Sequence, residues 1–157
     1  MDSYERLLQI GFQPNGALTA IKIMELESEI HFNMPQDYRQ FMMKSNGGRF
    51  LANTVCFIKV NDEEILLDSF LSLGAEARVD DIVYWYKTFG DEYEGINTAQ
   101  IALSDPGIIV LHNEPGQQGV YLWDDSLELE TSTEDNCMYK IADSFEEFVS
   151  KIYVEEI

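Results

Sequence analysis

Histidine and cysteine, which most often act as general bases, nucleophiles or zinc ligands, are scarce in this 157-residue chain. Together they number four: His31, His112, Cys56 and Cys137. The chain has neither the C-x-x-C nor the H-x-x-x-H spacing that is typical of zinc sites. His112 could activate a cysteine, but nothing in the sequence places it near either thiol. We therefore expect no metal site, and we interpret His112 as a partly buried residue at the end of a strand.

Carboxylates are so abundant that a pair of them indicates little. Any acidic protein offers neighbours that could serve as an acid and a base, and a solvated charge is the default for Asp or Glu in a turn. Residues 91–102, "DEYEGINTAQIA", are not a calcium loop, because the Gly comes fifth and the closing Glu is missing. The chain also lacks the G-x-G-x-x-G, G-x-x-x-x-G-K-[ST] and G-x-S-x-G motifs. We therefore expect no cofactor and no catalytic machinery.

The charge balance is the unusual property of the composition. Ten Lys and Arg residues against 29 Asp and Glu residues give a net charge of −19. A folded protein of this mass exposes roughly 8,000 Å², which leaves about one uncompensated negative charge per 400 Å². Such a field repels nucleic acid and anionic membranes and attracts basic partners. It also keeps a protein soluble, and composition alone does not separate the two roles.

Length and residue usage indicate one ordinary globular domain, residues 1–157. Hydrophobic residues are 45% and charged residues 25% of the chain, which has no repeat, low-complexity tract or linker. Two cysteines far apart are typical of free thiols in a reducing compartment. No run approaches the 18 apolar residues of a membrane span, and the acidic N-terminus lacks the layout of a signal peptide. We expect a cytoplasmic protein.

Helical signals dominate the first third of the chain. A short helix over residues 3–11 is expected to begin at Ser3, its N-cap, and to stop at Gly11. Thr19 is the expected N-cap of a second helix, which carries an apolar stripe. A third helix has Pro35 in its first turn and ends on Asn46 with a left-handed cap.

The rest of the chain alternates strand signals with two further helices. Strands are predicted at residues 54–60, 100–105, 107–113, 119–125 and 137–142, with an extended or mixed segment at 64–73. A helix at 79–89 has Asp80 as a possible cap, and a closing helix at 143–154 has a capping box at Ser144 and Glu147. Helices, then strands with an inserted helix, then a closing helix indicate an α+β fold.

Residues 23–48 contain the pattern I-x-x-L-E-x-x-I-x-x-x-M-P-x-x-Y-x-x-F-M-x-x-x-N-G-G. This pattern resembles the SUKH superfamily, which includes the yeast cell-wall-assembly regulators and many bacterial immunity proteins. Residues 101–125 and 141–153 are similar to the strand-rich middle and the closing helix of that family. Met34 departs from the usual Leu before Pro35, and the turn near Gly116 has fewer glycines than in many relatives.

The resemblance implies an α+β fold in which N-terminal helices and a C-terminal helix pack on a central mixed, mostly antiparallel sheet. It also implies binding rather than catalysis. Bacterial relatives neutralise a secreted or contact-delivered toxin, often a nuclease or a nucleic-acid deaminase, by binding it directly. The stretch "MPQDYRQFMMKSNGGRF" (residues 34–50) carries the resemblance. In it, Pro35 and Gly47 are expected to fix the geometry, Tyr38 and Phe41 to fill the core, and the binding surface to lie elsewhere.

The negative charge fits such a partner, because proteins that act on nucleic acids must bind phosphates and tend to be basic. An acidic inhibitor is steered to the same surface. We expect the contacts to come from acidic groups in predicted turns and from large aromatic residues that could anchor the interface. The acidic candidates are Asp62, Glu63, Asp91, Glu92, Glu94, Asp124 and Asp125. The aromatic candidates are Trp85, Tyr86, Tyr93 and Trp123.

Two other functions fit the sequence. The first is an intracellular scaffold or regulatory module that binds several proteins, although the chain lacks the long disordered flanks that such hubs often carry. The second is a hydrolase that uses a pair of carboxylates, which requires an Asp or Glu with a strongly raised pKa in a cleft.

Overall fold

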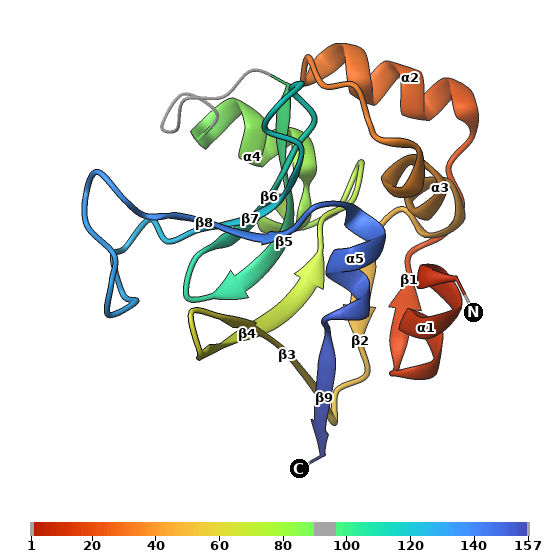
Figure 1. Cartoon of the computed structure of the whole chain (residues 1–157). Helices are drawn as coiled ribbons and strands as arrows, with labels where there is room; N and C mark the ends of the chain where they lie inside the picture. The colour runs from red at the N-terminus through yellow and green to blue at the C-terminus, as the bar shows by residue number, and fades with distance from the viewer. Residues whose placement is uncertain (1, 90–96, 157) are drawn as a thin grey trace.

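Nine strands in one sheet and five α-helices make up the described part of the chain, residues 2–89 and 97–156, in this computed structural model (Figure 1). The arrangement is α+β, as predicted. The helices are α1 (Ser3–Gln9), α2 (Ala20–Glu29), α3 (Gln36–Ser45), the 3-10 helix η1 (Arg78–Asp80), α4 (Ile82–Phe89) and α5 (Phe145–Ser150). The strands are β1 (Phe12–Pro14), β2 (Gly48–Phe50), β3 (Thr54–Val60), β4 (Glu63–Phe70), β5 (Thr98–Asp105), β6 (Ile108–His112), β7 (Gly119–Trp123), β8 (Met138–Ala142) and β9 (Tyr153–Glu156).

Every pair of neighbouring strands in the sheet is antiparallel in the described residues. The main path runs β1-β2-β4-β5-β6-β7-β8, and β3 and β9 branch from it because β3 pairs with β4 on one side and β9 on the other. β4 is long enough to hold two partners along one edge, β3 over Glu63–Leu67 and β2 near its end. No helix in the described residues has the length and apolar composition needed to cross a membrane.

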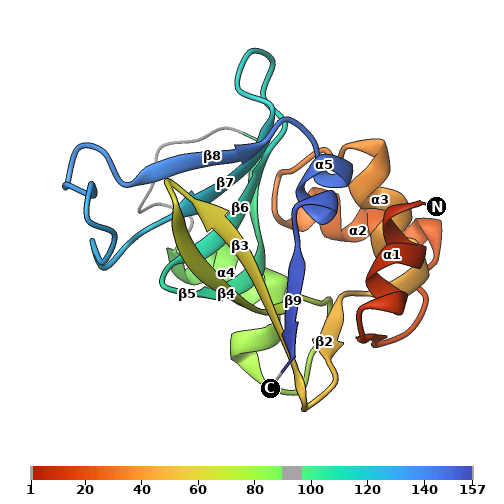
Figure 2. The same ribbon diagram turned by 60° about the horizontal axis from the view of Figure 1, so that its bottom comes forward.

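One face of the sheet is closed by α1, α3 and α5, with α2 stacked beyond (Figures 1 and 2). Phe41 on α3 lies at the centre of an aromatic cluster, with its ring 4.9 Å from that of Phe145 on α5 and 5.0 Å from that of Phe70 on β4. Tyr38 packs on the ring of Phe145 at 5.1 Å and is fully buried. The expectation that Tyr38 and Phe41 fill the core is confirmed.

Glu27 fixes the turn between α2 and α3. Its carboxylate accepts a hydrogen bond from the amide of Met34 at 2.8 Å and one from the guanidinium of Arg39 at 2.7 Å. The acid that follows Leu26 in the sequence pattern therefore ties the second helix to the third. An unpaired backbone donor in this half-buried turn would otherwise cost free energy.

The glycines of the Asn-Gly-Gly segment lie where the backbone leaves no room for a side chain. Gly47 has a φ of +68°, and a Cβ on it would stand 2.2 Å from the carbonyl oxygen of Leu71. A Cβ on Gly48 would stand 2.2 Å from the carbonyl oxygen of Gln13. Asn46 ends α3 in the left-handed conformation, as predicted. The two glycines therefore let three stretches of the backbone, at residues 47–48, at Leu71 and at Gln13, pack against one another.

Several predicted boundaries are wrong. Asp2, not Ser3, caps α1, because its carboxylate accepts the amide of Glu5 at 2.8 Å. Pro35 is the residue before α3 rather than a member of its first turn. Asp80 lies in η1, and the carboxylate of Asp81 instead accepts the amide of Val83 near the start of α4.

The closing helix is shorter than predicted. It ends at Ser150, and Tyr153–Glu156 form β9 on the free edge of β3. Pairing with β3 wins because Tyr153 stands opposite Phe57, with the two rings 5.9 Å apart. β1 and β2, three residues each, were not predicted at all.

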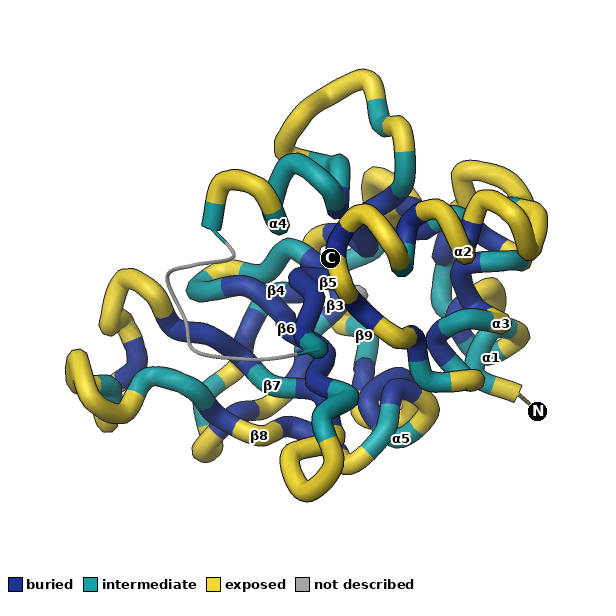
Figure 3. Tube along the Cα trace, turned by 90° about the horizontal axis from the view of Figure 1, so that it is seen from above, coloured by how far each residue is buried: buried dark blue, intermediate teal, exposed yellow. Residues whose placement is uncertain are grey.

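The opposite face of the sheet carries α4 (Figure 3). Trp85 and Phe89 of α4 pack against a small core of Ile108, Val110 and Trp123. Residues directly opposite each other on paired strands project from the same face. One row of such residues crosses the sheet on this second face: Arg49, Ser69, Leu103, Ile108, Trp123 and Met138.

Candidate protein-binding site

The loop between β7 and β8, residues 124–137, is built around a buried carboxylate. Asp124 is 0% exposed, and its carboxylate accepts hydrogen bonds from the amide of Glu128 at 3.0 Å, the amide of Leu129 at 2.8 Å and the hydroxyl of Ser132. Three donors from three later residues fold the chain back on the end of β7. The sequence alone suggested a solvated turn residue here, and that interpretation is wrong for Asp124.

Two opposing effects act on the pKa of Asp124. Burial raises it, but the hydrogen bonds from Ser132, Leu129 and Glu128 lower it, and the net pKa lies below the ordinary value of 3.8. The group is therefore ionised at neutral pH. A charged acceptor makes stronger hydrogen bonds than a neutral one, so the loop has a firm anchor.

The far half of the loop is tied to the sheet through Tyr139 on β8. The Tyr139 hydroxyl lies 2.7 Å from that of Ser132 and 3.0 Å from that of Thr131. Leu129 contributes an apolar anchor and is 4% exposed. The loop is thus a fixed projection, and Figure 1 shows it extending from the sheet beyond β8.

The turn between β3 and β4 lies against this loop, as Figure 2 shows. The amide of Glu130 donates to the carboxylate of Glu63 at 3.3 Å, and the side-chain amide of Asn61 donates to the hydroxyl of Thr131 at 3.4 Å. Both hydrogen bonds are long, but they join segments nearly 70 residues apart. Asp62 is exposed at the tip of the turn.

Together the turn and the loop form a surface that we call the acidic edge. It also contains one large exposed apolar side chain, Leu127, which is 38% exposed. Glu64 projects from the other face of β4 than Glu63 does and stands opposite Lys59, so it lies outside the acidic edge. The carboxylates of the acidic edge are Asp62, Glu63, Asp125, Glu128, Glu130, Glu134 and Asp135.

Seven of the ten Lys and Arg residues form ion pairs away from the acidic edge. Seven ion pairs are present among the described residues, and none includes a carboxylate of the acidic edge. Most of them join a residue of a helix to a nearby acid, as in the pair between Lys151 and Glu147 of α5. The carboxylates of the acidic edge therefore have no ion-pair partner among the described residues.

The structure separates the residues that were predicted to bind. Asp62, Glu63 and Asp125 lie on the acidic edge, whereas Asp124 lies beneath it. Trp123 is 7% exposed and belongs to the core under α4.

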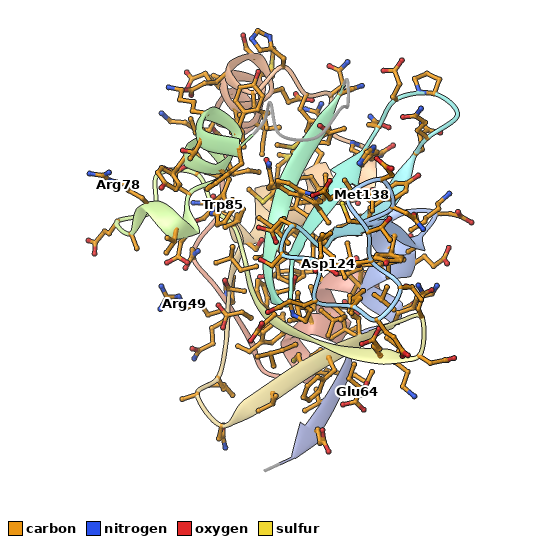
Figure 4. The ribbon with its side chains drawn as sticks, turned by 90° about the vertical axis from the view of Figure 1, so that its left-hand side faces the viewer. Arg49, Glu64, Arg78, Trp85, Asp124 and Met138 are labelled. Atoms are coloured by element: carbon orange, nitrogen blue, oxygen red, sulfur yellow. The ribbon has the colours of Figure 1, made fainter. Side chains whose placement is uncertain are left out.

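Trp85 is half-buried on α4, where its indole N–H donates to the carbonyl of Val79 at 2.8 Å. Figure 4 shows Trp85 away from Asp124, over the second face of the sheet. Asp91, Glu92 and Glu94 lie outside the described residues.

Four carboxylates of the acidic edge were not named from the sequence. Their signal was present in the run "LELETSTED", which places Glu128, Glu130, Glu134 and Asp135 after the apolar Leu127. Leu127 and Leu129 alternate with two glutamates as in a half-buried strand, but the run folds as a loop in which Leu127 is exposed. No local pattern indicated that the β3–β4 turn lies beside it.

Acid–base groups elsewhere show no enzyme-like arrangement. Within residues 2–89 and 97–156, no three His, Cys, Asp or Glu side chains converge on a metal-sized site. Asp2 and Asp143 have lowered pKa values, because Asp2 accepts the amide of Glu5 and Asp143 accepts a hydrogen bond from Lys140. Burial lowers the pKa of His112, which packs 4.4 Å from the ring of Tyr121. The hydrolase hypothesis, which needs a raised carboxyl pKa, gains no support from these groups.

Comparison with models of protein families identifies the family of the chain. Residues 17–151 match the SMI1 / KNR4 family (SUKH-1), and a search of curated proteins gives no match. The family includes immunity proteins of toxin systems, which bind cognate toxins, and its members are generally not enzymes. Because the match covers most of the sequence, this chain belongs to the SMI1 / KNR4 family (SUKH-1).

Proposed function

We propose that this protein is an immunity protein that binds and neutralises a cognate toxin, delivered by secretion or by contact, in the cytoplasm of the producing cell. Membership of the family supports the class of function. The observation that carries the proposal for this chain is the acidic edge: seven carboxylates on a fixed loop and turn, none of them in an ion pair with a described residue.

The partner that fits this edge is basic. A toxin that cleaves or deaminates nucleic acid needs a cationic surface to hold phosphates, and a row of carboxylates on a rigid projection can occupy that surface in place of the substrate. Leu127 would add an apolar contact within the charged area, and its burial on binding would contribute to the affinity. The toxin is therefore expected to be a basic nuclease or nucleic-acid deaminase.

Charged and apolar contacts are expected to act on different rate constants of the complex. Exposed charges act mainly on the association rate, because they steer encounters over a screening length of about 8 Å at physiological salt. Dissociation depends more on buried contacts such as that of Leu127. Electrostatic steering also predicts that affinity falls as salt rises.

The first test is co-expression with the toxin encoded beside its gene, followed by pull-down. The second compares two variants with the same change in net charge. One neutralises the edge at Glu128, Glu130, Glu134 and Asp135, each changed to its amide. The control neutralises four carboxylates elsewhere that form no ion pair with described residues: Glu5, Glu114, Glu146 and Glu155.

We expect protection by the wild type and the control, and a loss of roughly tenfold in association rate for the edge variant at low salt. Absence of both protection and a complex would remove the immunity function. Equal losses in the two variants would leave the function and remove the acidic edge as its site. Specific binding to several cellular proteins, with no toxin encoded nearby, would favour the scaffold role instead.

A further inference from the structure

A polar cleft of about 430 Å³ lies at the other end of the second face, away from the acidic edge. β2 and β4 form its floor, and the segment before α4 forms one wall. The volume is within the range of ligand-binding sites, roughly 300–1,000 Å³. Figure 4 shows Arg49 on the far side of the face from Asp124. The residues that line the cleft include Asn46, Gly48, Arg49, Ser69, Glu76 and Asp80.

The Asn-Gly-Gly segment builds this cleft. The side-chain oxygen of Asn46 accepts the amide of Leu73 at 2.8 Å, and its side-chain nitrogen donates to the carbonyl of the same residue at 3.1 Å. These two hydrogen bonds hold the wall in place beside Gly48, which lines the floor. From sequence alone the segment had a purely structural role, yet two of its residues face a cavity.

Ser69 supplies a buried hydroxyl on the floor of the cleft. It is 3% exposed, and it stands opposite Arg49 in the β2–β4 ladder, so both side chains project from the same face. Its hydroxyl has one neighbouring acceptor, a carboxylate oxygen of Asp68 at 3.5 Å. That distance exceeds the roughly 2.5–3.0 Å of a good O–H···O hydrogen bond, so the hydroxyl has bonding capacity to spare.

Asp80 is held in place at the cleft, whereas the side chain of Arg49 beside it is exposed to solvent. The backbone carbonyl of Asp80 accepts both the amide of Ser72 at 2.8 Å and its hydroxyl at 3.3 Å. The Asp80 side chain is 18% exposed, but that of Arg49 is 69% exposed and touches it through one nitrogen at 2.6 Å. A pair with so exposed a partner contributes little and exchanges readily. Asp80 is thus a built acceptor for a guanidinium, and Arg49 occupies it from the solvent side.

The charge of the expected ligand follows from the residues around the cleft. The net charge of −19 repels anions from the surface, and Glu76 adds a second carboxylate to the lining. Arg78 does not line the cleft and projects outward in Figure 4. A planar guanidinium presents five donors in a fixed fork, which suits separate carboxylate and hydroxyl acceptors better than a compact ammonium does.

We propose that this cleft binds the guanidinium group of an arginine side chain presented by a protein partner, which displaces Arg49 from Asp80. Only the identity of that protein rests on the proposed function, since a basic toxin would supply the arginine. The acidic edge would then attract the partner over long distances, and the cleft would capture one of its side chains.

The test uses the full chain and a small probe, Nα-acetyl-L-arginine amide, with the uncharged citrulline analogue as the control ligand. Amide chemical shifts are followed at low salt during titration. We expect saturable shifts around Ser72 and Asp80 in the millimolar range with the arginine probe and none with citrulline. Asp80→Asn should weaken binding roughly tenfold, and Arg49→Gln should strengthen it roughly two- to fivefold by removing the internal competitor.

Two further variants separate the cleft from the general field. Glu76→Gln changes an exposed residue that cannot disturb the core, so it keeps the test decisive even if Asp80→Asn fails to fold; it should weaken binding by about twofold or more. Asp135→Asn removes one charge far from the cleft and should change nothing. Absent shifts, equal shifts with citrulline, unchanged binding in Glu76→Gln, or weaker binding in Arg49→Gln would each overturn the proposal. Because no toxin is present, such a failure leaves the immunity function untouched.

Discussion

Replacing Asp124 by asparagine removes the charge at the base of the acidic edge and keeps the size of the side chain. In the wild type, one carboxylate oxygen accepts the amide of Glu128, and the other accepts the amide of Leu129 and the hydroxyl of Ser132. Asparagine has one acceptor oxygen. Its NH₂ group must face a backbone N–H that previously had a partner, and both groups are then left unsatisfied.

The expected cost follows from this count. A hydrogen bond to a charged group contributes about 1.5–3 kcal/mol, and an unsatisfied buried donor costs a similar amount. Losing one such bond and weakening two others should lower the free energy of unfolding by about 2–3 kcal/mol. Asp124→Ala removes all three and should cost about 3–5 kcal/mol. Asp125→Asn makes the same charge change at an exposed neighbour and should stay within about 0.5 kcal/mol of the wild type.

The dependence on pH has a definite sign. Because the folded-state pKa of Asp124 lies below the ordinary value of 3.8, its ionised form stabilises the fold above that value, and this contribution is lost as pH falls through the folded-state pKa. The difference in unfolding free energy between the wild type and Asp124→Asn should therefore be full at neutral pH and shrink below about pH 4.

Urea unfolding at a series of pH values measures the difference, and amide hydrogen exchange locates it. Glu128 and Leu129 should lose protection in Asp124→Asn, and the strands should change only by the global loss of stability. An unfolding midpoint equal to that of the wild type at neutral pH would refute the anchoring role. A loss that stays the same from neutral to acidic pH would refute the ionised state.

Three further outcomes are expected. Gly47→Ala should lower the free energy of unfolding by about 3 kcal/mol or more, since a Cβ would meet the Leu71 carbonyl oxygen at 2.2 Å; a normal urea midpoint would contradict the close approach. Leu127→Ser should leave stability within about 0.5 kcal/mol but shorten the lifetime of a toxin complex, measured as its dissociation rate, and an unchanged lifetime would exclude Leu127 as an anchor. Burial raises the pKa of Cys56 to about 11, so the folded protein should react fast with a thiol reagent only at the half-buried Cys137, and two fast thiols would contradict the burial of Cys56.

The elements that the sequence predicts well are those whose signals are local. Thr19 caps α2 through its own hydroxyl, and Ser144 caps α5, so each helix start depends on residues three positions apart. The missed strands have no such signal. β2 exists because Gly48 can pair with Phe70, and β9 because Tyr153 reaches Phe57. Pairings of this kind depend on the folded arrangement and not on the composition of a three- or four-residue segment.

The candidate site shows the same division. Asp62, Glu63 and Asp125 could be named from the sequence because charged residues in turns are usually exposed. The sequence could not show that Asp124 is buried and Asp125 is solvated, because the two are the same residue type in adjacent positions. The contacts of Glu63 with Glu130 and of Asn61 with Thr131 lie beyond any local pattern as well, and they join the β3–β4 turn and the β7–β8 loop into one surface.

The response to salt separates binding from solubility as possible roles of the acidic edge. Solubility requires only that charges cover the surface, and spreading them would lower their mutual repulsion. On the acidic edge, like charges stand together on a loop fixed by Asp124, and the described ion pairs lie outside it. Repulsion within the edge destabilises the free protein, and the proposed basic partner would relieve it. Salt screens both interactions, so it should favour the free fold and weaken the complex. A surface that served only solubility would show the first effect without the second.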